Sequence, residues 1–396
     1  MTDCMSKKRP GILILLLFLS FSAFANPDYK LLVNGSSAFP QIIECMRNSS
    51  QSIYINMFIW RDDNIGNLIA EECVKAADRG VKVTISKDTY GSVCEHAEES
   101  GTSFFHKKVS WTEKSKINFL KNTYKNKIAS DAKDFQSELY LHLINHPNIT
   151  VQADSFKADH SKYYIFDDEI LILGGINIED KENGADMSGR IYNDYMLMLC
   201  GKEYVQSFKQ GTTTGTGTIY FGKNLKAAKK KDNIFKMEEL YLDMIDSSQK
   251  ELTIVMAYFS PLKKFTDAIL KACERGVKVK IVIPASANFQ DDSNKQTVKH
   301  LLKKSRGQIR VYFSPKMLHT KLVAVDDLIS FGSCNITKKA FKQLDELNVF
   351  VSAREEELFN QIMQTVNQTV EESLQITDYK SIDNNSFLAF LEGFVV

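Results

Sequence analysis

Two polar patterns of the same composition recur in this chain of 396 residues. Each holds a histidine, a lysine two residues later, an aspartate five residues after the lysine, and an asparagine three residues after a glycine. The members are His160, Lys162, Asp167 and Asn177 in the first pattern and His319, Lys321, Asp326 and Asn335 in the second. Residues two apart in a strand share a face, so each histidine points the same way as its lysine. The apolar run that follows predicts a hairpin that returns the asparagine to the histidine.

These side chains suit the chemistry of a phosphate diester. A histidine offers a nitrogen base, a lysine offers a cation, and an asparagine offers an amide donor. Two such surfaces that face each other can hold the non-bridging oxygens and stabilise the charge that develops on them. One neutral histidine can attack phosphorus and form a covalent phosphohistidine. The other, protonated, can donate to the leaving oxygen and later activate an incoming water or alcohol.

A single pattern of this length would be a weak signal, because polar groups at alternating strand positions usually form a solvated face. Here, however, the patterns occupy matched places in a longer internal repeat. One further pair of repeated segments is Ser49-Ser50-Gln51 and Ser247-Ser248-Gln249, and each precedes a strand-like run. Another pair is Arg79 to Val83 and Arg275 to Val279, and each leads from a helix-like segment into a β-branched run. This double occurrence favours the functional interpretation.

The repeat predicts the fold class and the division of the chain. Strands that alternate with helices predict an α/β structure, and two copies predict two similar halves about a pseudo-twofold axis. We place the first half at residues 26–210, a linker at 211–235, and the second half with a C-terminal helix at 236–396. Gly80 precedes His160 by 80 residues, but Gly276 precedes His319 by only 43, so the first half carries an insertion near 87–147.

Through these paired motifs, the sequence resembles the phospholipase D superfamily over nearly its whole length. The resemblance implies two α/β halves, each a mixed sheet flanked by helices, with the active site at their interface and with no metal or other cofactor. It implies that His160 is the nucleophile and His319 the general acid. The implied catalytic set is His160, Lys162, Asp167, His319, Lys321 and Asp326, in which the two aspartates are more structural than catalytic. The implied phosphate-binding residues include Asn177 and Asn335.

The same resemblance implies that acidic residues beyond the motifs orient the histidines, and Glu346 and Asp194 occupy those places. The sequence also departs from the family pattern. Gly175 stands where the family often has a serine, so one hydroxyl donor is missing. The second hairpin is one residue shorter than the first, and the insertion in the first half is expected to cover or shape the substrate entrance.

The N-terminus predicts export. A positive start at Lys7, Lys8 and Arg9 precedes an apolar run from Ile12 to Phe24, and Ala23-Phe24-Ala25 forms a small-x-small cleavage site. This is the pattern of a signal peptide over residues 1–25, with an uncleaved anchor as the alternative. Six cysteines remain after Cys4, an even number that permits disulfides outside the cytoplasm, but small buried hydrophobic side chains are an equally good interpretation.

The motifs specify a phosphodiester but not which one. A net charge of +1 means that no global field attracts nucleic acid or an anionic membrane. Export favours a phospholipid substrate at a membrane surface. The alternative is an exported nuclease that acts on single strands, with which the lysine-rich run from Lys226 to Lys231 would agree. A binding protein with an idle site is a third class, which the two intact histidine–lysine pairs disfavour.

Overall fold

A computed structural model describes residues 28–99, 101–105, 109–125, 128, 136–153, 158–211, 213–215, 217–227 and 229–395. The predicted signal peptide over residues 1–25 lies outside the described residues. Within them, no helix combines the length and the apolar character that crossing a bilayer requires.

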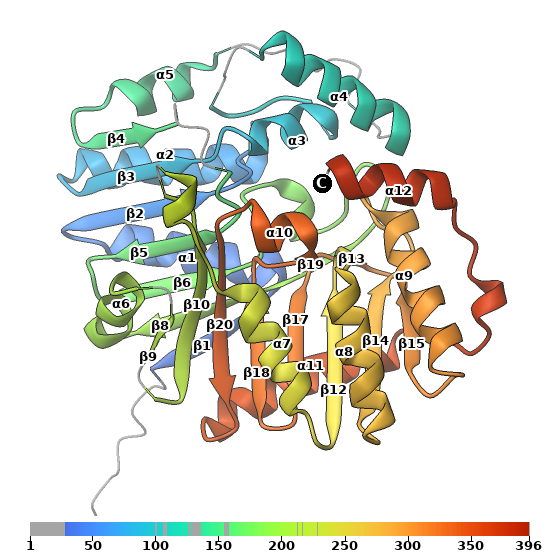
Figure 1. Cartoon of the computed structure of the whole chain (residues 1–396). Coiled ribbons are helices and arrows are strands. Elements are labelled where there is room, and N and C mark those ends of the chain that lie inside the picture. The colour runs from blue at the N-terminus through green and yellow to red at the C-terminus, as the bar shows by residue number, and fades with distance from the viewer. Residues whose placement is uncertain are drawn as a thin grey trace, which may run out of the picture.

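The first half is built on a seven-stranded mixed sheet (Figure 1), whose order is β1-β8-β6-β5-β2-β3-β4. The three strands at one end, β2, β3 and β4, are parallel, and the others pair antiparallel. Its strands are β1 (Tyr29–Val33), β2 (Ser52–Met57), β3 (Lys82–Lys87), β4 (Ile149–Gln152), β5 (Lys162–Phe166), β6 (Ile170–Gly174) and β8 (Tyr195–Cys200).

The second sheet repeats this strand order with its own seven strands, β10-β20-β18-β17-β12-β14-β15, and extends it by β11, β21 and β9. The seven strands are β10 (Ile219–Leu225), β12 (Glu251–Met256), β14 (Lys278–Pro284), β15 (Arg310–Ser314), β17 (Lys321–Val325), β18 (Leu328–Gly332) and β20 (Glu346–Ser352). The additions are β9 (Thr213–Gly215), β11 (Ile234–Phe235) and β21 (Leu374–Ile376). The repeat in the sequence is therefore a repeat of topology, and the predicted two-half α/β fold is confirmed.

Helices surround the two sheets. They are α1 (Asn34–Asn48), α2 (Asn64–Asp78), α3 (Gly91–Ala97), α4 (Trp111–Tyr124), α5 (Glu138–Asn145), α6 (Lys202–Lys209), α7 (Met237–Ser247), α8 (Lys263–Glu274), α9 (Asp291–Lys304), α10 (Lys338–Lys342), α11 (Glu356–Glu371) and α12 (Ser386–Val395), with 3₁₀ turns η1 (Asp180–Asn183), η2 (Lys230–Asp232) and η3 (Tyr379–Ser381). Helices α2 and α8 end at the repeated glycines, where Gly80 and Gly276 have φ values of 94° and 90°. This left-handed backbone favours glycine and lets the next strand begin at once.

The inner faces of the two sheets pack against each other. Strand β6 illustrates this packing. Leu171 and Leu173 join a core shared with the second half, whereas Ile172 between them packs in the core of the first half. From the second half, Ile329 and Phe331 of β18 enter the same shared core. A strand that is buried on both faces needs a continuous apolar run rather than alternation. The molecule is therefore a layered structure in which two sheets lie between two sets of helices.

The predicted linker at 211–235 requires a correction. Its central part forms strand β10, which pairs antiparallel with β20 and holds the place in the second sheet that β1 holds in the first. Ile219 and Phe221 point into the shared core and are fully buried. The glycine- and lysine-rich flanks concealed this short apolar alternation. The second half therefore begins before residue 236.

The insertion in the first half forms α3 and α4, which lie over the upper end of the molecule beside α12 in Figure 1. Two small pairings also join the halves: β7 (Tyr192–Asn193) pairs with β16 (Met317–Leu318), and Asp159 forms a bridge with Asp345. Within the second half, β13 (Phe259–Ser260) pairs with β19 (Ile336–Thr337). The six cysteines among the described residues are thiols, four of them buried.

Candidate active site

The two motif histidines are held by the same backbone arrangement, in which each half supports the histidine of the other. The backbone N–H of His160, just before β5, donates to the carbonyl oxygen of Asp345 at 2.9 Å. The backbone N–H of His319, just before β17, donates to that of Asn193 at 2.9 Å. The two small pairings between the halves therefore fix the register that brings the histidines to the interface.

The residue after each of these carbonyls supplies a carboxylate to the imidazole. Glu346 Oε2 lies 3.1 Å from Nδ1 of His160, and Asp194 Oδ2 lies 3.1 Å from Nδ1 of His319. Both carboxylates are buried. A contact at Nδ1 fixes the orientation of the ring and leaves Nε2 as the nitrogen that is available for chemistry. This is the geometry that the predicted orienting role requires, and both contacts cross between the halves.

The lysines and asparagines of the motifs lie beside the histidines. Lys162 Nζ donates to the carbonyl oxygen of His160 at 2.5 Å, and Lys321 makes the same contact with His319. The amide oxygen of Asn177 accepts the backbone N–H of Ile59 at 3.3 Å. Because that bond occupies the oxygen, the amide NH₂ of Asn177 is left to donate.

The second half repeats the asparagine contact. The amide oxygen of Asn335 accepts the backbone N–H of Tyr258 at 3.2 Å. Both lysines are fully buried, and both asparagines line the same cavity as the two histidines. The shorter second hairpin therefore does not displace Asn335. The arrangement places two lysines and two amide donors close to the two histidines.

The two motif aspartates lie at the far ends of β5 and β17, away from the histidines. Asp167 accepts the backbone N–H groups of residues 50, 51 and 52, each at 2.8 Å. Asp326 accepts those of residues 249, 250 and 251 at 2.7–2.9 Å. These N–H groups lie within and directly after the repeated Ser-Ser-Gln segments. The carboxylates of both aspartates therefore close the turns that lead into β2 and β12, which agrees with the structural role that the resemblance implied and not with a place among the groups that touch substrate.

Aromatic and charged residues complete the cavity. The ring of Phe58 meets that of His160 edge-on, with centroids 4.7 Å apart, and Tyr258 lies beside His319 at 6.4 Å. Lys181 lines the same cavity and forms ion pairs with Glu98 at 2.5 Å and with Glu179 at 3.4 Å. Glu98 directly follows α3 and lines the cavity, so the insertion contributes to the wall of the site.

His160 lies in surroundings that oppose its protonation. Burial lowers the pKa of this imidazole well below its usual value, and the positive charges of Lys162, Lys321 and His319 lower it further. Burial also raises the pKa of its neighbour Glu346 well above the usual value, although Lys162 and a hydrogen bond from Ser333 oppose this. The His160 imidazole is therefore neutral, with a lone pair on Nε2 when Nδ1–H faces Glu346.

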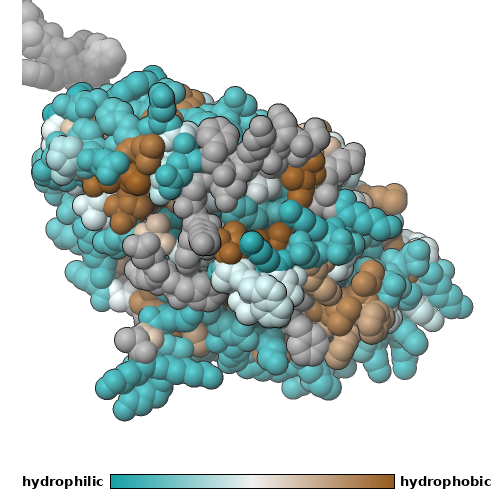
Figure 2. All heavy atoms as spheres, turned by 90° about the horizontal axis from the view of Figure 1, so that it is seen from above, coloured by the Kyte–Doolittle hydropathy of each residue, from teal (hydrophilic) through white to brown (hydrophobic). Residues whose placement is uncertain are grey.

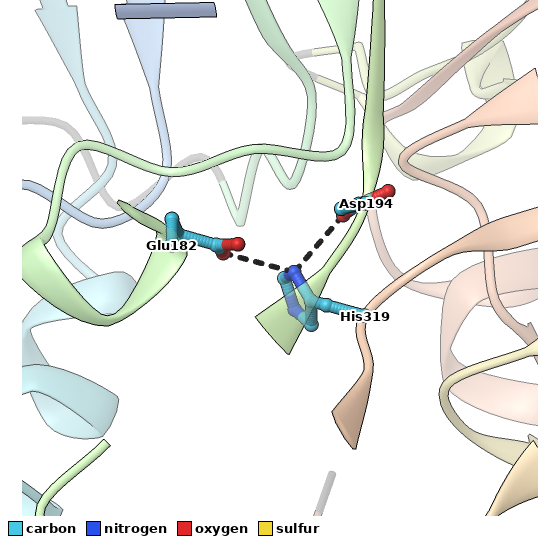
Figure 3. A group of neighbouring side chains, drawn as sticks. All are labelled: Glu182, Asp194 and His319. Atoms are coloured by element: carbon cyan, nitrogen blue, oxygen red, sulfur yellow. Dashed lines mark ion pairs between the residues drawn. The ribbon is translucent and has the colours of Figure 1, made fainter. Parts of the chain in front are cut away.

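His319 lies in the opposite environment because two carboxylates face its Nδ1 (Figure 3): Glu182 Oε1 at 3.0 Å and Asp194 Oδ2 at 3.1 Å. Burial and the charge of Lys321 lower the pKa of His319, but Glu182 and Asp194 outweigh them and raise it above the usual value. In turn the charge of His319 lowers the pKa of Glu182 despite burial. The two histidines therefore differ in protonation, as a nucleophile and a general acid should.

Glu182 was missed by the sequence analysis. It stands in η1, five residues after Asn177, in a run of charged residues that looks like an ordinary solvated turn. The position five residues after Asn335 is Ala340, so the second half has no carboxylate to match it. Comparison of the repeats at this offset is the signal that could have found Glu182. Among the described residues, Glu182, Asp194 and His319 are also the set whose ligand atoms, all within 4.8 Å of one another, could hold a metal ion.

The glycine at position 175 also has a structural reason. Its counterpart Ser333 donates its hydroxyl to Glu346 at 2.5 Å. A Cβ at Gly175 would instead meet Asp194 Oδ2 at 2.2 Å, closer than any real contact. The carboxylate of Asp194 therefore occupies the space that a serine side chain would need. Loss of the hydroxyl donor goes together with the approach of Asp194 to His319.

Comparisons with known proteins agree with this geometry. The sequence profile described as "Cardiolipin synthase, PLD-like domain" matches residues 42–210 and 241–372. A cardiolipin synthase of Staphylococcus aureus is 24% identical over 409 residues, which cover 96% of this chain and 75% of that protein. Cardiolipin synthase B of Salmonella typhimurium is 23% identical over 383 residues, covering 90% and 82%.

A solved structure shares the fold. The phosphatidylserine synthase of Haemophilus influenzae superposes with a TM-score of 0.65 at 15% identity, covering 92% of each chain. Its coverage spans both halves and the interface between them. The chain therefore belongs to the phospholipase D superfamily, in its family of cardiolipin synthase-like enzymes.

Proposed function

We propose that this enzyme transfers the phosphatidyl group of a phospholipid to an alcohol or to water, through a covalent phosphohistidine on His160 and without a metal. The observation that carries the proposal is the unequal environment of the two histidines. Two buried carboxylates hold a proton on His319, whereas burial and neighbouring cations keep one off His160. A double displacement at phosphorus needs this pairing of a nucleophile with an acid.

In the first step, Nε2 of His160 attacks phosphorus, and the bond from phosphorus to the head-group oxygen breaks. His319 gives its Nε2 proton to that oxygen, so the head group leaves as a neutral alcohol. Lys162, Lys321 and the amide groups of Asn177 and Asn335 surround the non-bridging oxygens. Because they are held in place before the reaction, they stabilise the developing charge without reorganising.

In the second step, the acceptor takes the place of the head group. Nε2 of His319, now neutral, removes the proton of the acceptor hydroxyl as its oxygen attacks phosphorus. The phosphorus–nitrogen bond to His160 breaks, and both histidines return to their starting states. A hydrolase and a transferase differ only in whether water or an alcohol reaches phosphorus first.

A phospholipid as the substrate is supported by the relatives, which are named for cardiolipin and phosphatidylserine synthesis. It is also supported by the walls of the site. Phe58, Leu120, Phe289 and Leu344 line the cavity that holds the two histidines. Such a surface receives acyl chains or a lipid backbone more readily than a polyanion.

The test uses purified protein, mixed phospholipid vesicles, a short primary alcohol and a chelator, with mass spectrometry of the lipids. We expect a phosphatidyl-alcohol that persists with the chelator and is absent with His160→Ala. Formation of neither phosphatidyl-alcohol nor phosphatidic acid would refute the lipid substrate, and single-stranded DNA and RNA would be assayed next.

A second experiment distinguishes the two histidines. With a p-nitrophenyl phosphodiester the leaving group needs no proton, so His319→Ala should still release p-nitrophenol and should accumulate protein-bound phosphate. His160→Ala should do neither. Equal labelling of both variants, or labelling of His160→Ala alone, would contradict the assignment of the nucleophile.

Export also belongs to the proposal. Its support is the N-terminal pattern of a positive start, an apolar run and the Ala23-Phe24-Ala25 site. Peptide mass spectrometry of fractionated cells should find a chain that begins at Asn26 outside the cytoplasm, or an uncleaved chain in the membrane fraction. Recovery of the full chain from the cytoplasm would argue against both forms.

A further inference from the structure

An outer vestibule leads to the catalytic cavity. It is a cavity of about 650 Å³, and it shares Tyr90, Leu120, Lys339 and Leu344 with the space that holds the two histidines. Its walls come from α4 of the insertion, α10 and α12, so residues far apart in the sequence form one entrance. A substrate that reaches the histidines through this vestibule passes between α4 and α12.

Both helices expose aromatic side chains beside the vestibule. On α4, Trp111 is 82% exposed and Phe119 is 36% exposed. Positions 111, 115 and 119 follow at four-residue intervals, which places them along one side of the helix. Ser115 and Phe119 line the vestibule, so this side of α4 continues the vestibule wall outwards to Trp111.

Helix α12 repeats the arrangement on the opposite wall. Phe387 and Phe390 are 68% and 62% exposed, and Leu391 beside them lines the vestibule. The other side of the helix is fixed to the fold, because Ala389 and Glu392 accept hydrogen bonds from Ser293 of α9. The outward position of the two phenylalanines is therefore set by a buried anchor. We call Trp111, Phe119, Phe387 and Phe390 the collar.

Cations lie within the collar. Lys116, Lys226 and Lys339 line the vestibule, and the ammonium groups of Lys339 and Lys116 lie 4.1 and 6.0 Å from the centroid of the Tyr90 ring. Since the whole chain has a net charge of only +1, any attraction to an anionic surface has to be local. Figure 2 shows this end of the molecule from above as a hydrophilic surface broken by separate apolar patches.

We propose that the collar and the vestibule lysines form a docking surface for an anionic phospholipid bilayer. Large aromatic side chains favour the boundary between head groups and acyl chains, and lysines near it are attracted to anionic lipids. A bilayer fits better than a protein partner because the exposed aromatics lie on both helices that wall the vestibule, α4 and α12, and this end of the molecule shows separate apolar patches instead of one continuous patch. Docking there places a lipid head group directly over the vestibule. The choice of a bilayer as the binding partner of this surface rests on the proposed function, in which the substrate is a phospholipid.

The chain carries its own probe of this contact. It has two tryptophans, of which Trp60 is fully buried and Trp111 is exposed. Vesicles of phosphatidylcholine with phosphatidylglycerol should shift the tryptophan emission to the blue and protect it from acrylamide. Vesicles of phosphatidylcholine alone should do so less, and added salt should weaken the effect.

Flotation with the same vesicles measures the contribution of the collar. Phe387→Ser/Phe390→Ser should bind roughly tenfold more weakly or worse, since burial of one phenylalanine in an apolar phase favours binding by about that factor. Trp111→Ser, on the other helix, should also bind more weakly. Leu374→Ser is the matched control, because Leu374 is 70% exposed on the edge strand β21 and does not line the vestibule. All three variants should cleave a soluble p-nitrophenyl phosphodiester as the wild type does.

The outcomes separate this inference from the proposed function. His160→Ala should float with vesicles as the wild type does. Vesicle binding without any phosphatidyl transfer would refute the function and leave the docking surface standing. Wild-type protein that does not bind anionic vesicles, or collar variants that bind as well as the wild type, would overturn the docking surface.

Discussion

Replacement of Glu182 by glutamine should move the alkaline limb of the pH–rate profile to lower pH. Two buried carboxylates lie at nearly equal distances from Nδ1 of His319, 3.0 Å for Glu182 and 3.1 Å for Asp194. Both raise the pKa of the imidazole, and the charge of Glu182 is the largest of the causes that raise it. Glutamine keeps the size of the side chain and removes one of the two charges.

The magnitude follows from what remains in the variant. Burial and Lys321, which lower the pKa of His319, are unchanged, and Asp194 alone opposes them. An opposite charge at such a distance typically shifts a pKa by about 1–3 units, and one unit corresponds to about 1.4 kcal/mol. Since His319 must be protonated to act as the acid, the rate is lost as pH rises through its pKa. That loss should begin about 1–3 pH units earlier in Glu182→Gln.

Two measurements test this. One is kcat/KM against pH with a lipid substrate, whose leaving alkoxide needs a proton. The other is the NMR titration of labelled histidine, with the His319 signal assigned by its absence in His319→Asn. Glu203→Gln, an exposed glutamate on α6 of the same half, is the control. A folded Glu182→Gln with an unchanged alkaline limb and an unchanged His319 titration would refute the reasoning.

Three further predictions follow from the geometry. Asp167→Ala and Asp326→Ala should each lower the free energy of unfolding by roughly 1–3 kcal/mol in denaturant titrations, because each carboxylate accepts hydrogen bonds from backbone N–H groups. The kcat of both variants should stay nearly unchanged, and a large loss of kcat in a stable variant would contradict this prediction. The pKa values of Asp167 and Asp326 are lower in the folded protein than in the unfolded chain, where an aspartate has a pKa of about 4. The stabilisation by these carboxylates is therefore fully present above about pH 4 and is lost as the pH falls through their pKa values in the folded protein. Gly175→Ser should reduce kcat by roughly 10- to 100-fold in steady-state assays, because the new Cβ displaces Asp194, and an active variant would show that the carboxylate tolerates the shift. Burial and, after it, the charge of Lys321 lower the pKa of Lys162 to about 7, so Lys162 loses its charge as the pH rises through that value. The KM for a phosphodiester should therefore rise above pH 7. A KM that does not change with pH would show that the charge of Lys162 does not contribute to substrate binding.

The sequence allowed the two-half fold and most of the site to be predicted, because the repeat supplied an internal comparison. A histidine and a lysine two apart on a strand must share a face, and the second copy made chance improbable. Asp194 and Glu346 could be placed from the family pattern. Their crossing between the halves could not be predicted, because it depends on how two sheets pack and no local pattern encodes that.

The failures have physical reasons as well. Strand β10 could not be recognised in the predicted linker, because a short apolar alternation between glycines and lysines gives no strand signal of its own and becomes a strand only by pairing with β20. Glu182 is hard to recognise from the sequence because a turn with several charged residues is usually solvated. The Glu182 side chain becomes buried only through the packing of the second half, which brings His319 into contact with it. In both cases a long-range contact decided the outcome.

The exchange of carboxylates between the halves has a consequence for what each half can do alone. A fragment with only one half would lack the acidic partner of its own histidine, and would regain it only by pairing with a second copy. In a symmetric pair of identical halves the two histidines would be equivalent before substrate binds, and only the orientation of the bound substrate would determine which histidine attacks. Covalent fusion removes that constraint. Because Glu182 stands in one copy where the other copy has Ala340, the two histidines already differ before any substrate binds. Under the proposed mechanism, each substrate would therefore be attacked from one direction only.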